Sequence, residues 1–170
     1  TGGSSSGSGS AVSARMAFGS LGSDTGGSIR LPAGFCGLVG MKPTQTRVSR
    51  YGVMGLSFSL DNVGPLTRTV KDNALILSAI AGHDPKDATS STQPVCNYLE
   101  AADNPSAKGY KIGIARGYFE DNADDEIIES RDAAINSFRE LGATIVEIDY
   151  GNIDPINSLS AFIAGTEAAT

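Results

Sequence analysis

Two segments rich in glycine and serine carry the side chains that could act on a substrate. The first covers residues 1–10 and the second ends at Ser28. A serine hydroxyl is a poor nucleophile at neutral pH, so it needs a base and donors for the oxyanion that forms during attack on a carbonyl. The donors would be the backbone N–H groups of a turn of small residues: Thr25, Gly26, Gly27 and Ser28 itself. The alternative is a tight turn that uses glycine only for its positive φ.

The first segment has two rival interpretations. Gly3 to Gly7 fits the G-x-S-x-G nucleophile elbow, centred on Ser5, and Asp61 and His83 then follow in the chain order Ser, Asp, His. An elbow needs a strand before it, and the few residues before Gly3 predict none. A phosphate loop would need a third glycine where Val12 stands and a G-K-[ST] motif, which does not follow.

Composition favours a small-molecule partner. The chain of 170 residues is 40% hydrophobic, and 13 Lys+Arg against 19 Asp+Glu give a net charge of −6. Such a charge disfavours binding to nucleic acid or to an anionic membrane. Cys36 and Cys96 are too few for a disulfide framework, so we expect a reducing cytoplasm. A single histidine, His83, and no metal-ligand spacing predict that no metal is bound.

The first half of the chain predicts short elements around these loops. A helix is expected over Ala11 to Phe18, and the second Gly-rich segment, 22–28, is expected to be a loop. Apolar runs broken by Gly, Pro and Ser predict short strands over residues 35–66. Thr69 to Asp72 resembles a capping box, and the helix that it opens should end at Gly82.

The second half predicts a parallel βαβ unit. A connection follows His83, with a short helix over 98–102. Strands are expected at 111–115 and 143–148, joined by a helix that starts in the acidic segment 122–126. This order of strand, helix and strand favours parallel pairing and an α/β fold.

Three blocks of the sequence, taken in order, resemble the amidase signature. They are Gly2 to Ser8, Gly22 to Arg30 and Phe35 to Thr44. The resemblance continues through Arg47 to Gly52, Ser59 to Asp61, Gly64-Pro65 and Ala81 to Pro85. It extends to stand-alone amidases and to the glutaminase subunit of tRNA-dependent amidotransferases.

The resemblance implies a Ser-Ser-Lys triad. Ser28 would attack the amide carbonyl and form an acyl-enzyme, while Ser4 would relay the proton to the lysine. The family places a cis peptide before the relay serine, which here is the bond between Gly3 and Ser4. It places the lysine upstream of residue 1, and Lys42, in a different block, is expected to be structural.

Neighbouring side chains are expected to support this site. Asp24 and Arg30 flank the nucleophile with opposite charges and should pair to hold the turn. Ser5 should donate a hydrogen bond within the same network. Ser6 departs from the family, which usually has glycine there.

The resemblance also implies an organisation and a function. It predicts an internal piece of an α/β amidase-signature fold with a mixed, mostly parallel twisted sheet flanked by helices. A core at 1–90 and a connection at 91–109 would precede a βαβ continuation of the same domain at 110–170. The lead hypothesis is hydrolysis of a small-molecule amide without a cofactor. The alternatives are a glutaminase subunit with an amidotransferase partner chain and a non-catalytic remnant. The partner of the chain could also be a second copy of itself, in a homodimer.

Overall fold

The computed structural model of the chain describes residues 1–104, 106–115, 117, 119–121 and 123–169. These residues fold as two units. The first unit comprises Thr1–Asp103 and the chain from Leu159 onward, and the second comprises Asn104–Ser158. None of the helices in the described part of the chain combines the length and apolarity required to cross a bilayer.

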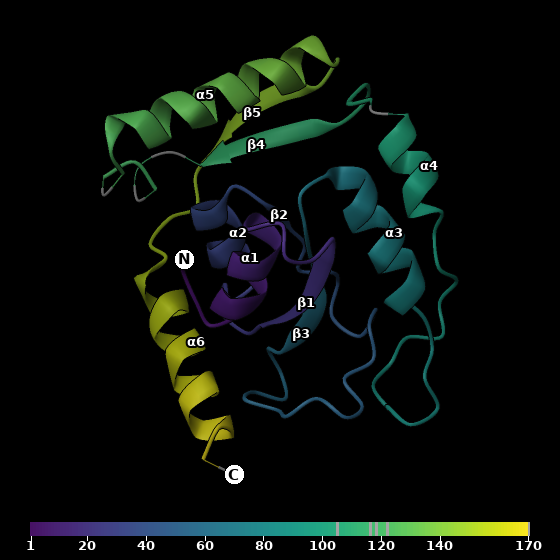
Figure 1. Cartoon of the computed structure of the whole chain (residues 1–170). Helices are drawn as coiled ribbons and strands as arrows, with labels where there is room; N and C mark the ends of the chain where they lie inside the picture. Colours follow the sequence, from purple (N-terminus) through teal and green to yellow (C-terminus); the bar gives the residue numbers. More distant parts are fainter. Residues whose placement is uncertain (105, 116, 118, 122, 170) are drawn as a thin grey trace. The chain divides into compact units, whose positions relative to one another are not determined.

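An antiparallel sheet of three strands forms the centre of the first unit (Figure 1). Strands β1 (Gly19–Asp24) and β2 (Val39–Gly40) both pair with β3 (Asn62–Thr67), which lies between them. All residues of β3 except Val63 are buried. The α/β class is confirmed, but the parallel pairing that we expected occurs, among the described residues, only in the second unit.

Two short helices pack beside this sheet, and they begin where sequence propensity does not predict them. Helix α1 spans Ser6–Ser13, so the helix that we expected over residues 11–18 starts earlier, inside the Gly/Ser segment. Its Gly9 and Val12 are buried, which shows that packing has overridden the low helix propensity of glycine and serine. Helix α2 (Arg30–Cys36), which we did not predict, ends at Gly37 with φ of 64°.

The prediction for the 69–82 helix is confirmed. Helix α3 spans Val70–Ile80, and the Thr69 hydroxyl accepts a hydrogen bond from the Asp72 amide at 3.1 Å. Asn73 on α3 is buried and its amide group donates to the carbonyl of Val39, which ties the helix to the sheet. Helix α4 (Tyr98–Asp103) lies where a short helix was expected.

The second unit contains the predicted βαβ arrangement. Strands β4 (Lys111–Ala115) and β5 (Thr144–Ile148) pair in parallel, and helix α5 (Asp125–Glu140) lies along them (Figure 1). Asn122, at which we expected this helix to start, lies outside the described residues. The last helix, α6, spans Asp154–Glu167.

The core of the first unit lies directly beneath the second Gly-rich segment. Ile29, Ala33 and Leu66 are buried and packed together, with Leu38 against them. Ile29 immediately follows Ser28 in the chain. The segment that carries Ser28 is therefore anchored to the core by its next residue, as a rigid site requires.

Candidate active site

The two serine segments lie side by side. The Ser5 amide donates to the Ser28 carbonyl at 3.1 Å, so Ser4 is placed next to the chain at Ser28. The Ser5 hydroxyl accepts from the Ser23 amide at 3.1 Å and lies 3.2 Å from the Ser23 carbonyl, to which it donates. The expected cis peptide between Gly3 and Ser4 is present. Within the described residues, the Ser4 and Ser28 hydroxyls are not hydrogen-bonded to each other.

Glycine allows this close approach. A Cβ on Gly22 would lie 2.7 Å from the Ser5 hydroxyl oxygen. Gly2 has φ of 63°, and a Cβ there would lie 2.9 Å from the backbone carbon of Leu31. Larger residues at these positions would push the neighbouring segments apart. The glycines therefore allow close backbone contact and do not indicate a flexible linker.

Asp24 organises the turn that carries the nucleophile. Its side chain is 0% exposed, and its two oxygens accept hydrogen bonds of 2.9 Å from the half-exposed Arg30 guanidinium. The same carboxylate also accepts from the amides of Gly27, Ile29 and Arg30. Burial opposes its charge, but these hydrogen bonds outweigh burial and lower the pKa of Asp24 to about 2. The ion pair that we expected between the two residues is present.

The predicted oxyanion donors differ in their surroundings. Strand β1 ends at Asp24, so residues 25–28 lie beyond the sheet ladder. The Gly27 amide donates to Asp24 at 2.7 Å, and Gly27 is buried with φ of 131°. Of the four amides predicted as oxyanion donors, that of Gly27 is therefore directed at a carboxylate in this structure. The amides of Thr25, Gly26 and Ser28 have no such partner among the described residues.

Asp61 lies beside Thr25 and makes contacts that the sequence did not reveal. Its Oδ1 accepts a hydrogen bond from the Thr25 hydroxyl, and its Oδ2 accepts from the amides of Leu56 and Ser57 at 2.7 and 2.9 Å. The sequence suggests Asp61 only as a member of an elbow triad. The available sequence signal was its position directly before the apolar segment that forms β3.

The structure excludes the elbow interpretation. His83 is exposed, and its Nδ1 lies 3.1 Å from the Ser90 hydroxyl. Asp61 contacts Thr25 instead of His83, and the Ser5 hydroxyl contacts the Ser23 backbone. A Ser-Asp-His relay centred on Ser5 is therefore not assembled.

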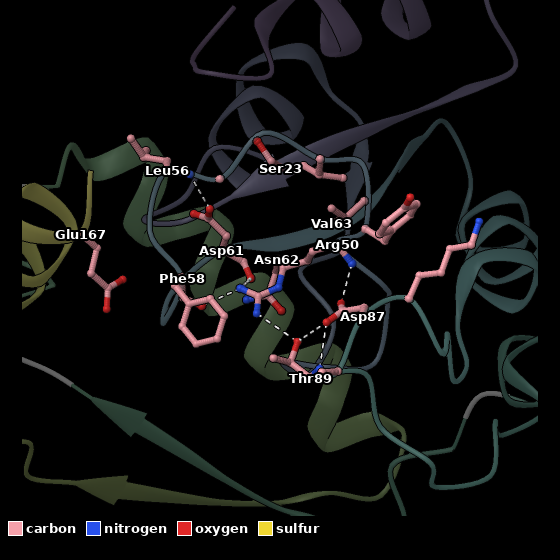
Figure 2. Close-up of a pocket in the computed structure, with 15 residues that line it drawn as sticks. Ser23, Arg50, Leu56, Phe58, Asp61, Asn62, Val63, Asp87, Thr89 and Glu167 are labelled. Atoms are coloured by element: carbon pink, nitrogen blue, oxygen red, sulfur yellow. Dashed lines mark hydrogen bonds between the residues drawn. The ribbon is translucent and has the colours of Figure 1, made fainter. Parts of the chain in front are cut away.

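A pocket of about 430 Å³ lies beside this network, and both Ser23 and Asp61 line it (Figure 2). The Arg50 guanidinium lies 5.0 Å from the centroid of the Phe58 ring and donates to the Thr89 hydroxyl at 3.1 Å. Asp87 accepts from the Arg50 amide and from Thr89, and these hydrogen bonds lower the pKa of Asp87 to about 2. The charged groups of Arg50 and Asp87 therefore already have partners.

On the other side of the pocket, Glu167 binds the loop that contains Ser57 and Ser59 (Figure 2). Its carboxylate accepts from the Ser57 hydroxyl at 2.5 Å and from the Ser59 amide and hydroxyl at 2.9 and 2.5 Å. These bonds lower the pKa of Glu167. Among the described residues, His, Cys, Asp and Glu side chains form no group of three that could hold a metal ion.

Comparison with known proteins now identifies the family. A family model described as Amidase matches residues 1–170, and the chain belongs to this family. Its similar curated relatives include a glutamyl-tRNA(Gln) amidotransferase subunit of Pelobacter propionicus, which is 51% identical over 99% of this chain and 34% of the relative. The corresponding subunit of Geobacter sulfurreducens is 48% identical over 99% of this chain and 35% of the relative. The chain thus spans about a third of the length of these relatives.

Solved structures give the same result for the fold. The corresponding glutamyl-tRNA(Gln) amidotransferase subunit from Thermotoga maritima superposes with a TM-score of 0.91 at 38% identity, over 98% of this chain and 36% of that chain. The native peptide amidase from Stenotrophomonas maltophilia superposes with a TM-score of 0.85 at 33% identity, over 98% and 34%. The chain therefore has part of the amidase-signature fold, as the three sequence blocks predicted.

Proposed function

We propose that this chain supplies the nucleophile and the proton relay of an amidase that hydrolyses a small-molecule carboxylic amide. The observation that carries the proposal is the hydrogen bond from the Ser5 amide to the Ser28 carbonyl, which joins two serine segments far apart in sequence. In a member of the amidase family, this juxtaposition favours a catalytic site over a simple glycine turn.

In this proposal, Ser28 attacks the amide carbon and forms a tetrahedral intermediate, which collapses to an acyl-enzyme and releases ammonia or an amine. Ser4 passes the proton of the Ser28 hydroxyl to a lysine outside these 170 residues, and the same path returns a proton to the leaving group. Water then attacks the acyl-enzyme and releases the acid. No cofactor or metal is required.

The oxyanion would be stabilised by the amides of Thr25, Gly26 and Ser28. Backbone donors already held in place are effective because they need little reorganisation as the negative charge develops. Asp24 and Arg30 have a supporting role, since their ion pair and the amide contacts of Asp24 fix the turn that presents these donors. Ser5 supports the site by joining the two segments.

A glutaminase subunit of a tRNA-dependent amidotransferase is the second candidate. The observation that favours it is the higher identity to the amidotransferase subunits, 51% for the one from Pelobacter propionicus, than to the peptide amidase, at 33%. In that case the protein would bind a partner chain and act in the cytoplasm. Co-purification of the complete polypeptide with a second chain would separate this candidate from a stand-alone amidase.

The test of the proposal uses the complete polypeptide that the gene encodes. A fluorophosphonate probe should label the wild-type protein and should not label Ser28→Ala. Ser4→Ala should slow acylation by roughly 100-fold or more, in the range of general acid–base effects. Equal labelling of wild type and Ser28→Ala would remove Ser28 from the mechanism, and circular dichroism of both proteins controls for misfolding.

A further inference from the structure

We propose that Asp61 is a positioning residue for the nucleophile loop, residues 25–28, and that it acts through the Thr25 hydroxyl. This inference rests on the proposed amidase function, because it assigns a purpose to the loop that precedes Ser28. Asp61 itself would touch neither the substrate nor the reacting atoms. It would fix the Thr25 peptide and so determine where the neighbouring amides point.

Strand register places the two residues opposite each other. β1 and β3 pair antiparallel, and their last pair at this end is Asp24 with Asn62. One step beyond this pair, Thr25 faces Asp61, although 36 residues separate them in the chain. The hydroxyl–carboxylate hydrogen bond thus continues the strand pairing at the point where the backbone ladder stops.

The two carboxylate oxygens of Asp61 accept hydrogen bonds from two different loops. Oδ1 accepts from Thr25 in the nucleophile loop, residues 25–28. Oδ2 accepts from the amides of Leu56 and Ser57 in the pocket loop, residues 56–60, and Figure 2 shows the bond from Leu56. Asp61 is 9% exposed, so little water competes for these bonds. A hydrogen bond to a carboxylate is stronger and more directional than one between neutral groups, so it restrains Thr25 effectively.

The pocket loop is itself held firmly, so it can act as a fixed support. The amides of Leu60 and Asp61 donate to the Ser57 carbonyl at 3.2 and 2.9 Å. Glu167 holds Ser57 and Ser59 from the other side. A carboxylate mounted on such a loop can hold the Thr25 side chain in one orientation while the neighbouring amides remain available to a substrate.

The test combines Thr25→Val, Asp61→Asn and the double variant in the complete polypeptide. Thr25→Val keeps the shape and the backbone amide of Thr25 and removes only the hydroxyl. Each single variant should lower kcat for amide hydrolysis by about 10- to 100-fold, less than the loss of a complete oxyanion donor, and should change KM by less than about 2-fold. The double variant should be no slower than the slower single variant, because both remove the same bond.

Two further variants separate positioning from general stability. Thr25→Ser keeps a hydroxyl and should recover most of the activity. Thr69→Val removes a similar hydroxyl–carboxylate bond, 2.8 Å to Asp72 at the start of α3, away from residues 25–28 and from the pocket, and should change kcat by less than about 2-fold. Thermal unfolding of every variant identifies any loss of activity that comes from misfolding.

The outcomes are distinct. Multiplicative losses in the double variant, or full activity in Thr25→Val, would overturn the role of Asp61 while leaving the Ser28 assignment intact. Probe labelling of Ser28→Ala would overturn the amidase proposal and this inference together. Loss of labelling in Ser28→Ala with non-multiplicative losses at Thr25 and Asp61 would support both.

Discussion

The antiparallel three-stranded sheet of the first unit and the parallel β4–β5 pair of the second differ in how far they are buried. β3 is buried along almost its whole length, whereas β5 has one partly buried residue and four exposed ones. Contacts around β1 and β3 join distant segments, such as Thr25 with Asp61. Contacts in the second unit are often local, such as Arg131 with the adjacent Asp132.

This difference predicts that the second unit tolerates substitution better than the first. In the first unit, one side chain often serves two segments, so its loss disturbs both. In the second unit, many side chains contact residues close to them in the sequence. The following changes test that contrast on the free energy of unfolding in urea, beginning with the largest expected effect.

Glycines in the two sheets give the sharpest comparison. A Cβ on Gly64 in β3 would overlap the Met41 carbonyl oxygen, which is backbone and cannot rotate away. For a Cβ on Gly113 in β4, the three nearest atoms would be side-chain atoms of Ile148, the first at 2.8 Å. We expect Gly64→Ala to lower the free energy of unfolding by about 3 kcal/mol or more and Gly113→Ala by less than about 1 kcal/mol. Equal losses would show that the two sheets are equally crowded.

Removal of the Asp24 carboxylate should have the next largest effect. Asp24→Ala leaves the amides of Gly27 and Ile29 without their acceptor inside the fold. Hydrogen bonds to charged groups contribute about 1.5–3 kcal/mol each, and Arg30 can recover solvation because it is half-exposed, so we expect a loss of roughly 2–3 kcal/mol. A loss below that of Gly113→Ala would mean that the turn is held by other contacts.

The same carboxylate predicts a dependence on pH. The pKa of Asp24 is lowered from 3.8 to about 2 in the folded chain, so its charge stabilises the fold fully at pH values above the unfolded pKa. This contribution should be lost as pH falls from about 4 through about 2. The difference in unfolding free energy between wild type and Asp24→Asn should therefore be constant above pH 5 and shrink below pH 4. A difference that stays constant down to pH 2 would contradict the assignment.

The smallest effect is expected for an ion pair in the second unit. Arg131 lies 2.6 Å from a Glu120 oxygen and 2.7 Å from an Asp132 oxygen, at a partly exposed position on α5. Exposed ion pairs contribute little because water and salt screen them, so Arg131→Ala should barely change the urea midpoint. A shift as large as that of Asp24→Ala would show that this pair is structurally central.

The sequence by itself determined the elements whose signals are local. The Thr69 to Asp72 cap and the apolar spacing after it predicted α3, and strand, helix and strand predicted the parallel β4–β5 pair. The three signature blocks correctly indicated the family and the cis peptide before Ser4. Such features depend on residues within a few turns of one another or on a motif that can be read directly.

Only the tertiary structure decided which distant groups meet. Helix α1 begins at Ser6 because packing buries Gly9 and Val12, which propensity alone does not predict. The amide of Gly27 is directed to Asp24, and Asp61 contacts Thr25 because the β1–β3 register aligns them. Register depends on the free energy of the whole sheet and its covering helices, and no local pattern around either residue contains that information.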